Sequence, residues 1–125
     1  MKINGIIYIK VYANRFRLKV AEEGNREIDI SASEPFTTER LIVGNFEPAV
    51  KILKEGIKKA YGKRLVKPII VIHPLEKIEG GLSQIEKRVL KDLGEGAGAR
   101  KVYFWVGPEL SDSEILHKIE NDNFI

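Results

Sequence analysis

Cysteine is absent from the sequence, and histidine occurs only twice. The absence of cysteine excludes disulfide bonds, thiol chemistry and cysteine-ligated metals, and it is typical of proteins that stay in a reducing cytoplasm. No apolar run approaches the ~18 residues of a membrane-spanning helix, and residues 1–5 lack the apolar core of a signal peptide. We therefore expect a cytoplasmic protein that does not enter a membrane.

Length and composition predict one domain, which we assign to residues 1–125. Of the 125 residues, 43% are hydrophobic, which suffices for one core but not for two ordinary domains. The net charge is +3, but residues 45–67 hold seven basic residues against two glutamates, and residues 109–125 hold five acidic residues against one lysine. Such polarity can steer association with a partner, or it can be an ordinary solvated surface.

Hydrophobic patterning predicts three antiparallel strands at the start of the chain. Residues 6–12 form an apolar run broken only by Lys10, and the turn pair Ala13-Asn14 leads into strict alternation over residues 15–20. The apolar and basic sides of this second strand are formed by Phe16, Leu18 and Val20 and by Arg15, Arg17 and Lys19, respectively. We interpret the basic side as wet or partner-facing. A turn with Gly24 and Asn25 at positive φ should precede a third strand over residues 26–31.

Residues 67–106 predict a crossover unit with two parallel strands at the centre of the sheet. Apolar runs at residues 68–72 and 102–106 are typical of strands covered on both faces, and a helix over residues 83–97 separates them. Ser83 and Glu86 have the spacing of a capping box. The predicted buried stripe of this helix is Ile85, Val89, Leu90, Leu93 and Ala97.

Two further helices complete the predicted fold. Asn45 is a suitable N-cap for a helix over residues 46–61, and Ser111 with Glu114 forms a second capping box that opens a helix over residues 111–121. We expect the apolar tail Phe124-Ile125 to dock on the domain. The order is β-β-β-α-β-α-β-α, which predicts an α/β fold with a mixed five-stranded sheet and flanking helices.

Residues 73–75, 83–88 and 96–102 resemble the first subdomain of actin-like ATPases of the MreB type. In those ATPases a strand ending near a proline precedes a helix with a similar opening, and an alanine- and glycine-rich turn leads into the next strand. On residues 40–46, 79–86 and 110–113 the chain is also similar to the YjaA-like family of small enterobacterial stress-associated proteins. The resemblance implies a single ribonuclease-H-like, actin-like half-domain with the hairpin strands at one edge.

The likeness to the ATPases breaks in the first hairpin. Actin-like enzymes have an aspartate and a glycine there, which position the metal-bound water and wrap the nucleotide phosphates, whereas residues 9–14 offer Lys10 and Tyr12. A lysine cannot ligate Mg²⁺, and a tyrosine blocks the backbone approach that glycine permits. We therefore expect no ATP hydrolysis and no cofactor.

Three alternative sites follow from the sequence. His73, Glu76 and Glu79 lie at the carboxyl end of the fourth predicted strand and could form the metal or acid–base site of a hydrolase, or simply occupy a strand end and a loop. Residues 80–83 lead into a helix N-terminus, which can bind an anion. Lys51, Lys54 and Lys58 on the first helix, like the basic strand face, could contact nucleic-acid phosphates, although no aromatic residues interleave with the lysines.

The favoured hypothesis is a non-enzymatic protein-binding domain of the stress-associated or toxin-neutralising (immunity) type, on a degenerate MreB-like scaffold. Its partner would be a protein, with a toxin as one class. The binding surface would combine the basic strand face with the loops at residues 74–81 and 107–112. The partner-binding residues are predicted to be Arg15, Arg17, Lys19, Glu76, Glu79, Glu109 and Asp112. A nucleotide- or nucleic-acid-binding domain and a hydrolase remain the alternatives.

Overall fold

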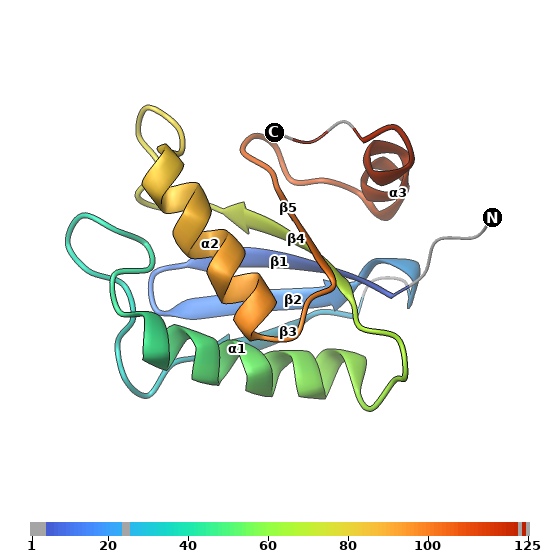
Figure 1. The fold of residues 1–125 in the computed structure, drawn as a ribbon, viewed down its shortest axis with the longest axis horizontal. Helices are drawn as coiled ribbons and strands as arrows, with labels where there is room; N and C mark the ends of the chain where they lie inside the picture. Colours follow the sequence, from blue (N-terminus) through green and yellow to red (C-terminus); the bar gives the residue numbers. More distant parts are fainter. Residues whose placement is uncertain (1–4, 24–25, 123, 125) are drawn as a thin grey trace.

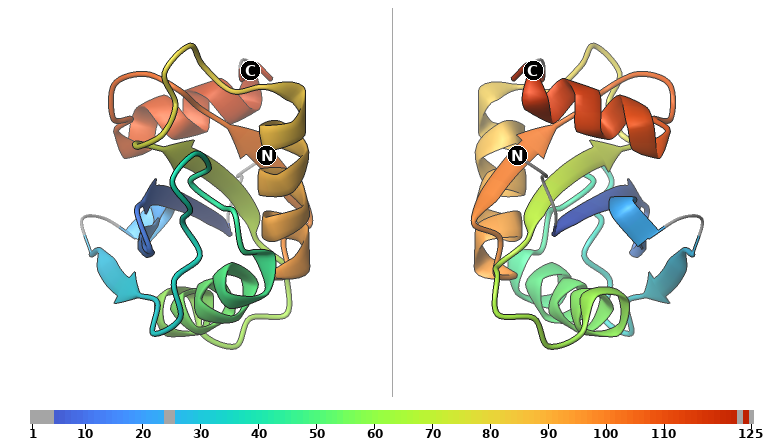
Figure 2. Two further views of the ribbon diagram at one scale, coloured as in Figure 1. Left: turned by 90° about the vertical axis from the view of Figure 1, so that its left-hand side faces the viewer. Right: turned by 90° about the vertical axis from the view of Figure 1, so that its right-hand side faces the viewer.

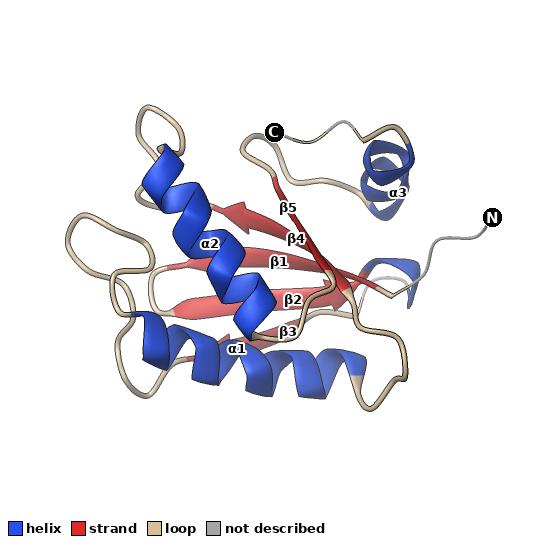
Figure 3. Cartoon of the chain, in the orientation of Figure 1, coloured by secondary structure: helices blue, strands red, loops and turns tan. Residues whose placement is uncertain are grey.

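The computed structural model describes residues 5–23, 26–122 and 124. Within these residues the chain forms a five-stranded sheet with three α-helices (Figures 1 and 3). The strands are β1 (Ile6–Tyr12), β2 (Arg15–Val20), β3 (Ile28–Ser31), β4 (Ile69–Pro74) and β5 (Lys101–Phe104), the helices are α1 (Phe46–Tyr61), α2 (Gln84–Gly96) and α3 (Asp112–Glu120), and η1 (Ala21–Glu23) is a short 3₁₀ turn. The predicted mixed five-stranded sheet with flanking helices is confirmed.

The strand order is β3-β2-β1-β4-β5, so the hairpin strands and the parallel strands lie on opposite sides of β1. β2 pairs antiparallel with both β1 and β3, whereas β4 pairs parallel with both β1 and β5. The predicted parallel pairing of the strands before and after α2 is confirmed. Lys10 of β1 stands opposite Arg17 of β2 and His73 of β4, which brings three polar residues into one row across the sheet.

The larger core lies between the sheet and the α1–α2 layer. Alternation along β1 turns Ile7, Ile9 and Val11 toward these helices, where they are fully buried. α1 crosses under β2 and β3 at close range, because a Cβ at Gly56 would lie 3.0 Å from Ile30 Cγ2. This side of the sheet is sealed by two helices, and Figure 2 shows α3 on the opposite side.

The smaller core lies under α3. Ile115 and Ile119 of α3 pack with Tyr8 of β1 in a second cluster of buried residues. The ring of Phe124 lies 4.9 Å from that of Tyr103, centroid to centroid, so the predicted docking of Phe124 is confirmed; Ile125 lies outside the described residues. The last described part of the chain therefore covers its first strand.

Both predicted capping boxes are confirmed. The Ser83 hydroxyl accepts a hydrogen bond from the Glu86 amide at 3.2 Å, and the Glu86 carboxylate accepts one from the Ser83 amide at 3.0 Å. Ser111 and Glu114 repeat the arrangement at the start of α3. Asn45 occupies the predicted N-cap position of α1, but its side chain makes no capping bond and donates instead to the Pro35 carbonyl.

Several predicted boundaries and burial patterns are wrong. β3 begins two residues later than predicted, β4 covers Ile69–Pro74 rather than the apolar run 68–72, and β5 ends at Phe104, two residues before the end of the run 102–106. β5 is half-buried rather than covered on both faces, because it is the last strand of the sheet. Ile85, assigned to the buried stripe of α2, is 75% exposed, since it precedes the turns of α2 that bury Leu90 and Leu93. The predicted turn at Gly24 and Asn25 lies outside the described residues.

No helix in the described part of the chain is long and apolar enough to cross a membrane.

Candidate functional site at the carboxyl ends of β1 and β4

A group of polar side chains gathers where β1 and β4 end, on the α3 side of the sheet. We call it the polar cluster, and its members are Tyr8, Lys10, Arg17, Glu27, His73 and Glu109. Tyr8 and His73 are fully buried and Lys10 is 4% exposed, which is unusual for a lysine. Register explains the grouping, because Lys10 faces both Arg17 and His73 across the sheet.

Tyr8 and His73 form a buried hydrogen-bonded pair. The Tyr8 hydroxyl accepts a hydrogen bond from the Leu110 amide at 3.2 Å and lies 2.6 Å from Nδ1 of His73. The amide has only a donor to offer, so the phenol proton is left for His73 Nδ1, and we assign the imidazole proton to Nε2. The hydrogen bond to Tyr8 thus fixes the orientation of the His73 ring, and the Nε2 tautomer is our assignment from this bond.

Burial keeps the Tyr8–His73 pair neutral. It raises the pKa of Tyr8 to about 12, with smaller contributions from nearby acidic groups. Burial also lowers the pKa of His73, and the charge of Lys10 adds to this, whereas the backbone of Gly107 and the charge of Glu109 act in the opposite direction. Neither side chain therefore carries a charge at neutral pH.

Lys10 is charged and held by two carboxylates. Its Nζ lies 2.9 Å from Oε1 of Glu109 and 3.4 Å from Oε2 of Glu27. Burial by itself lowers the pKa of Lys10, but the hydrogen bond that Lys10 donates to Glu109 and the charge of Glu27 outweigh it, so the pKa is raised. The same hydrogen bond lowers the pKa of Glu109. The cluster therefore holds a fixed ammonium group beside a neutral imidazole.

The predicted partner-binding residues of β2 are paired within the chain. Arg17 Nε lies 2.6 Å from Glu27, Arg15 lies 2.5 Å from Asp29, and Lys19 Nζ lies 3.0 Å from Asp112. Arg15 and Arg17 are partly exposed, as predicted. The prediction of a wet Lys19 is wrong, because it is 7% exposed and paired with the first residue of α3. Glu109 and Asp112, predicted as partner contacts, serve as counter-ions of Lys10 and Lys19.

The predicted loop residues do not join the polar cluster as a ligand set. The Glu76 carboxylate accepts a hydrogen bond from the Ala13 amide at 2.6 Å and so holds the β1–β2 turn. Glu79 is exposed beside the two glycines that precede α2. Across residues 5–23, 26–122 and 124, no group of three or more histidine or acidic side chains is placed to hold a metal ion. His73, Glu76 and Glu79 therefore do not form such a group.

The other two alternative sites have ordinary structural surroundings. At residues 80–83 the capping box already uses the Ser83 hydroxyl and amide. Lys51, Lys54 and Lys58 are exposed on α1, with Glu47 and Glu55 on the same helix.

Sequence reasoning missed Tyr8 and Glu27. A tyrosine inside an apolar strand was the available signal, because a buried phenol requires a hydrogen-bond partner. Glu27 could not have been placed in the polar cluster from the sequence, because its two cationic partners lie on β1 and β2, and the sequence does not give the register of these strands.

A second surface is apolar and lies at the start of α2. We define the apolar patch as Leu41, Ile85 and Val89 together with Ile42, Val43 and Leu90 beneath them. These six residues and Glu86 line a shallow hollow. Leu41 is 39% exposed and Ile85 is 75% exposed, whereas Ile42, Val43 and Leu90 are buried. The patch joins the loop after β3 to α2.

The chain is similar to a bacterial protein over most of its length. The chain is 29% identical over 125 residues to the uncharacterized protein YjaA of Escherichia coli (strain K12), and the alignment covers 89% of this chain and 94% of that protein. No family model matches the chain. The similarity supports a YjaA-like protein over most of the length.

Proposed function

We propose that the chain is a cytoplasmic, non-enzymatic protein-binding domain of the stress-associated or toxin-neutralising type. It would use a ribonuclease-H-like, actin-like half-domain as a scaffold. The arrangement of the hairpin strands on one side of β1 and the parallel strands on the other supports this scaffold. The observation that carries the binding function is the apolar patch.

The apolar patch has the properties of a protein-binding surface. Isolated exposed apolar residues are common, but here Leu41 and Ile85 flank one hollow whose floor is buried and apolar. Glu86, the one charged residue among those that line the hollow, adds a polar group to it, as protein interfaces combine apolar and polar residues. Covering Ile85 would remove a side chain that is now 75% exposed from water, which favours association.

The first hairpin supports the loss of ATPase chemistry. The residue at the place of the metal-positioning aspartate is Lys10, and its ammonium group is buried between two glutamates. At the place of the phosphate-wrapping glycine stands Tyr12, with the Arg15 guanidinium 4.1 Å from its ring centroid. Both positions are used for packing and ion pairing within the chain.

The charge balance of the basic strand face favours protein over nucleic acid. The three cations of this face, Arg15, Arg17 and Lys19, and the neighbouring Lys10 of β1 are each paired with a carboxylate. A phosphate backbone would have to compete with these carboxylates for every cation.

Affinity purification with patch variants tests the proposal. Wild-type chain and a Leu65→Glu variant should recover the same protein partner in stoichiometric amount from cells that produce the chain natively. Leu65 is a matched control, because it is fully exposed and lies outside the apolar patch. Ile85→Glu should recover at least about tenfold less, since a charge would be buried at the contact.

Two results would overturn the proposal. One is the recovery of no partner by any form of the chain, and the other is micromolar binding of ATP with Mg²⁺ in calorimetry, which would restore the enzyme alternative. The toxin-neutralising form further requires that the partner arrest growth when it is produced without this chain.

A further inference from the structure

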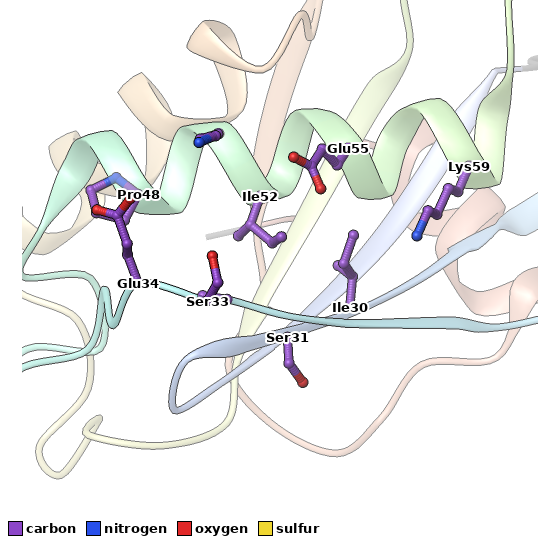
Figure 4. A pocket seen from close by; sticks show the side chains of 10 residues that line it. Ile30, Ser31, Ser33, Glu34, Pro48, Ile52, Glu55 and Lys59 are labelled. Carbon is purple, nitrogen blue, oxygen red and sulfur yellow. The ribbon is translucent and has the colours of Figure 1, made fainter.

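A groove runs between α1 and β3, the outermost strand of the hairpin side (Figure 4). Its volume is about 320 Å³, and Ile30, Ser33, Pro48, Ile52 and Glu55 are among the residues that line it. Ile30 is buried and Ile52 half-buried, while Ser31, Ser33 and Glu55 are exposed. The groove thus has an apolar floor and polar walls.

Half of the backbone hydrogen-bonding groups of β3 point away from β2, along this groove. The Ala32 amide donates to the Asn14 carbonyl, and Ile30 stands opposite Phe16 in the same register. Residues alternate in an antiparallel ladder, so Ile30 and Ala32 direct their backbone groups toward β2, and residues 29, 31 and 33 direct theirs away from it. No described strand pairs with this outer edge. Such an edge is a template for another strand.

The wall formed by α1 carries a regular charge pattern. Lys51, Glu55 and Lys59 all line the groove and are spaced four residues apart along α1. This spacing corresponds to a rise of ~6 Å on a helix, and two residues of an extended strand advance by ~6.6 Å. Three alternate side chains of a strand lying in the groove would therefore each lie beside one of these three charges.

β3 and α1 run in opposite directions along the groove. A Cβ at Gly56 would lie 3.0 Å from Ile30 Cγ2, and Figure 4 shows Pro48 near Glu34 at the other end. Strand positions opposite Ile28, Ile30 and Ala32 would accordingly lie beside Lys59, Glu55 and Lys51, in that order. The side chains that best match these neighbours are acidic, basic and acidic.

We propose that the groove binds an extended segment of a partner protein as a sixth strand, with acidic, basic and acidic side chains at alternate positions facing α1. The backbone of β3 supplies the hydrogen bonds, and the charges of α1 select the sequence, as in other cases of strand addition. The inference rests on the proposed function, for which it names the chemistry of a partner, and it uses a surface separate from the apolar patch.

A second copy of this chain fits the groove poorly. Two copies paired antiparallel through β3 would place Lys51 beside the other copy's Lys59 and Glu55 beside the other copy's Glu55. Like charges would meet at all of these positions, which opposes association. The pattern favours a different protein as the occupant.

The test uses synthetic peptides and the 125-residue chain. The probe is acetylated Thr-Glu-Thr-Lys-Thr-Glu-Thr, and its control is the charge-inverted Thr-Lys-Thr-Glu-Thr-Lys-Thr. Amide NMR titrations at low salt give both the affinity and the binding site. We expect the probe to shift the amides of residues 29, 31 and 33. It should bind about tenfold more tightly than the inverted peptide, because the probe gains exposed ion pairs with α1 whereas the inverted peptide places like charges at the same positions.

Charge-reversal variants sharpen the test. A Lys51→Glu/Lys59→Glu chain should prefer the inverted peptide, whereas a Lys58→Glu/Lys63→Glu chain, which changes the net charge equally outside the groove, should keep the original preference. Two N-methylated probes, one methylated on the three charged residues and one on the threonines between them, examine the backbone pairing. Whether the peptide pairs parallel or antiparallel with β3, one of the two sets of amides points toward β3, so the probe methylated on that set should lose binding.

Equal affinity for both peptides, shifts confined to other residues, or full binding by both N-methylated probes would overturn the proposal. So would concentration-dependent self-association that shifts the same β3 amides. In these cases a partner recovered through the apolar patch would leave the proposed function standing. Conversely, selective peptide binding without any recovered partner would support the groove and count against the proposed role of the patch.

Discussion

Removal of one oxygen atom from Tyr8 should destabilise the whole domain. The Tyr8 hydroxyl is the acceptor for the Leu110 amide and the donor to His73 Nδ1, and all three groups are buried. Tyr8→Phe keeps the ring in the smaller core but leaves an amide hydrogen and an imidazole nitrogen without partners. Neither Tyr8 nor His73 has any solvent-exposed surface.

The magnitude follows from the two groups left unsatisfied. A buried donor or acceptor that loses its partner costs about 1–3 kcal/mol, so the variant should lose about 3 kcal/mol of unfolding free energy. For a domain of this size that corresponds to a fall of about 10 °C in Tm.

Urea denaturation followed by circular dichroism measures this loss directly. Tyr12→Phe is the matched control, because the contact of Tyr12 with Arg15 is made by its ring and survives the change; it should alter the unfolding free energy by less than about 0.5 kcal/mol. A Tyr8→Phe variant as stable as this control would refute the bridging role of the hydroxyl and the tautomer assigned to His73.

Three further variants probe other parts of the structure. Because burial lowers the pKa of His73, the unfolded chain binds a proton at this residue at a higher pH than the folded chain does. The free energy of unfolding should therefore be highest above pH ~6.5 and fall as the pH drops through the folded pKa. In equilibrium unfolding, His73→Leu should lack this pH dependence. Lys10→Asp should lower the free energy of unfolding by at least about 3 kcal/mol, because it buries a third carboxylate beside two glutamates. Lys10→Met should stay within about 1 kcal/mol of wild type. Equal losses of unfolding free energy for the two variants in urea would contradict this account. Gly94→Ala should destabilise by about 1–3 kcal/mol, because its Cβ would lie 2.7 Å from Val102, whereas Gly96→Ala, with 3.7 Å of clearance, should not; thermal unfolding that ranks them in the opposite order would show that α2 can shift.

The fold was largely predictable because each signal for it is local. Apolar runs, strict alternation in β2 and two capping boxes identify the strands and helices without knowledge of their neighbours. The errors arise where an element ends or meets another. Ile85 has the spacing of a buried residue but lies on the first turn of α2, and Lys19 has the spacing of a wet residue but lies under α3.

The polar cluster was only partly predictable, because its pairs are distant in sequence. Lys10 can be recognised from the sequence because it interrupts an apolar strand, but its partner Glu109 lies 99 residues away. Register decides such pairs, and register depends on how β1 is flanked by β2 and β4. Single residues of the site can therefore be recognised from sequence, whereas their pairing requires the assembled sheet.

The placement of α3 over β1 has a consequence for synthesis. The hydrogen bond between Leu110 and Tyr8 and the packing of Ile115 on the same strand join β1 to a segment that is synthesised about 100 residues later. One face of the nascent sheet therefore stays uncovered until this segment has left the ribosome. Chains truncated before α3 should accordingly bind the dye ANS, and the 125-residue chain should not.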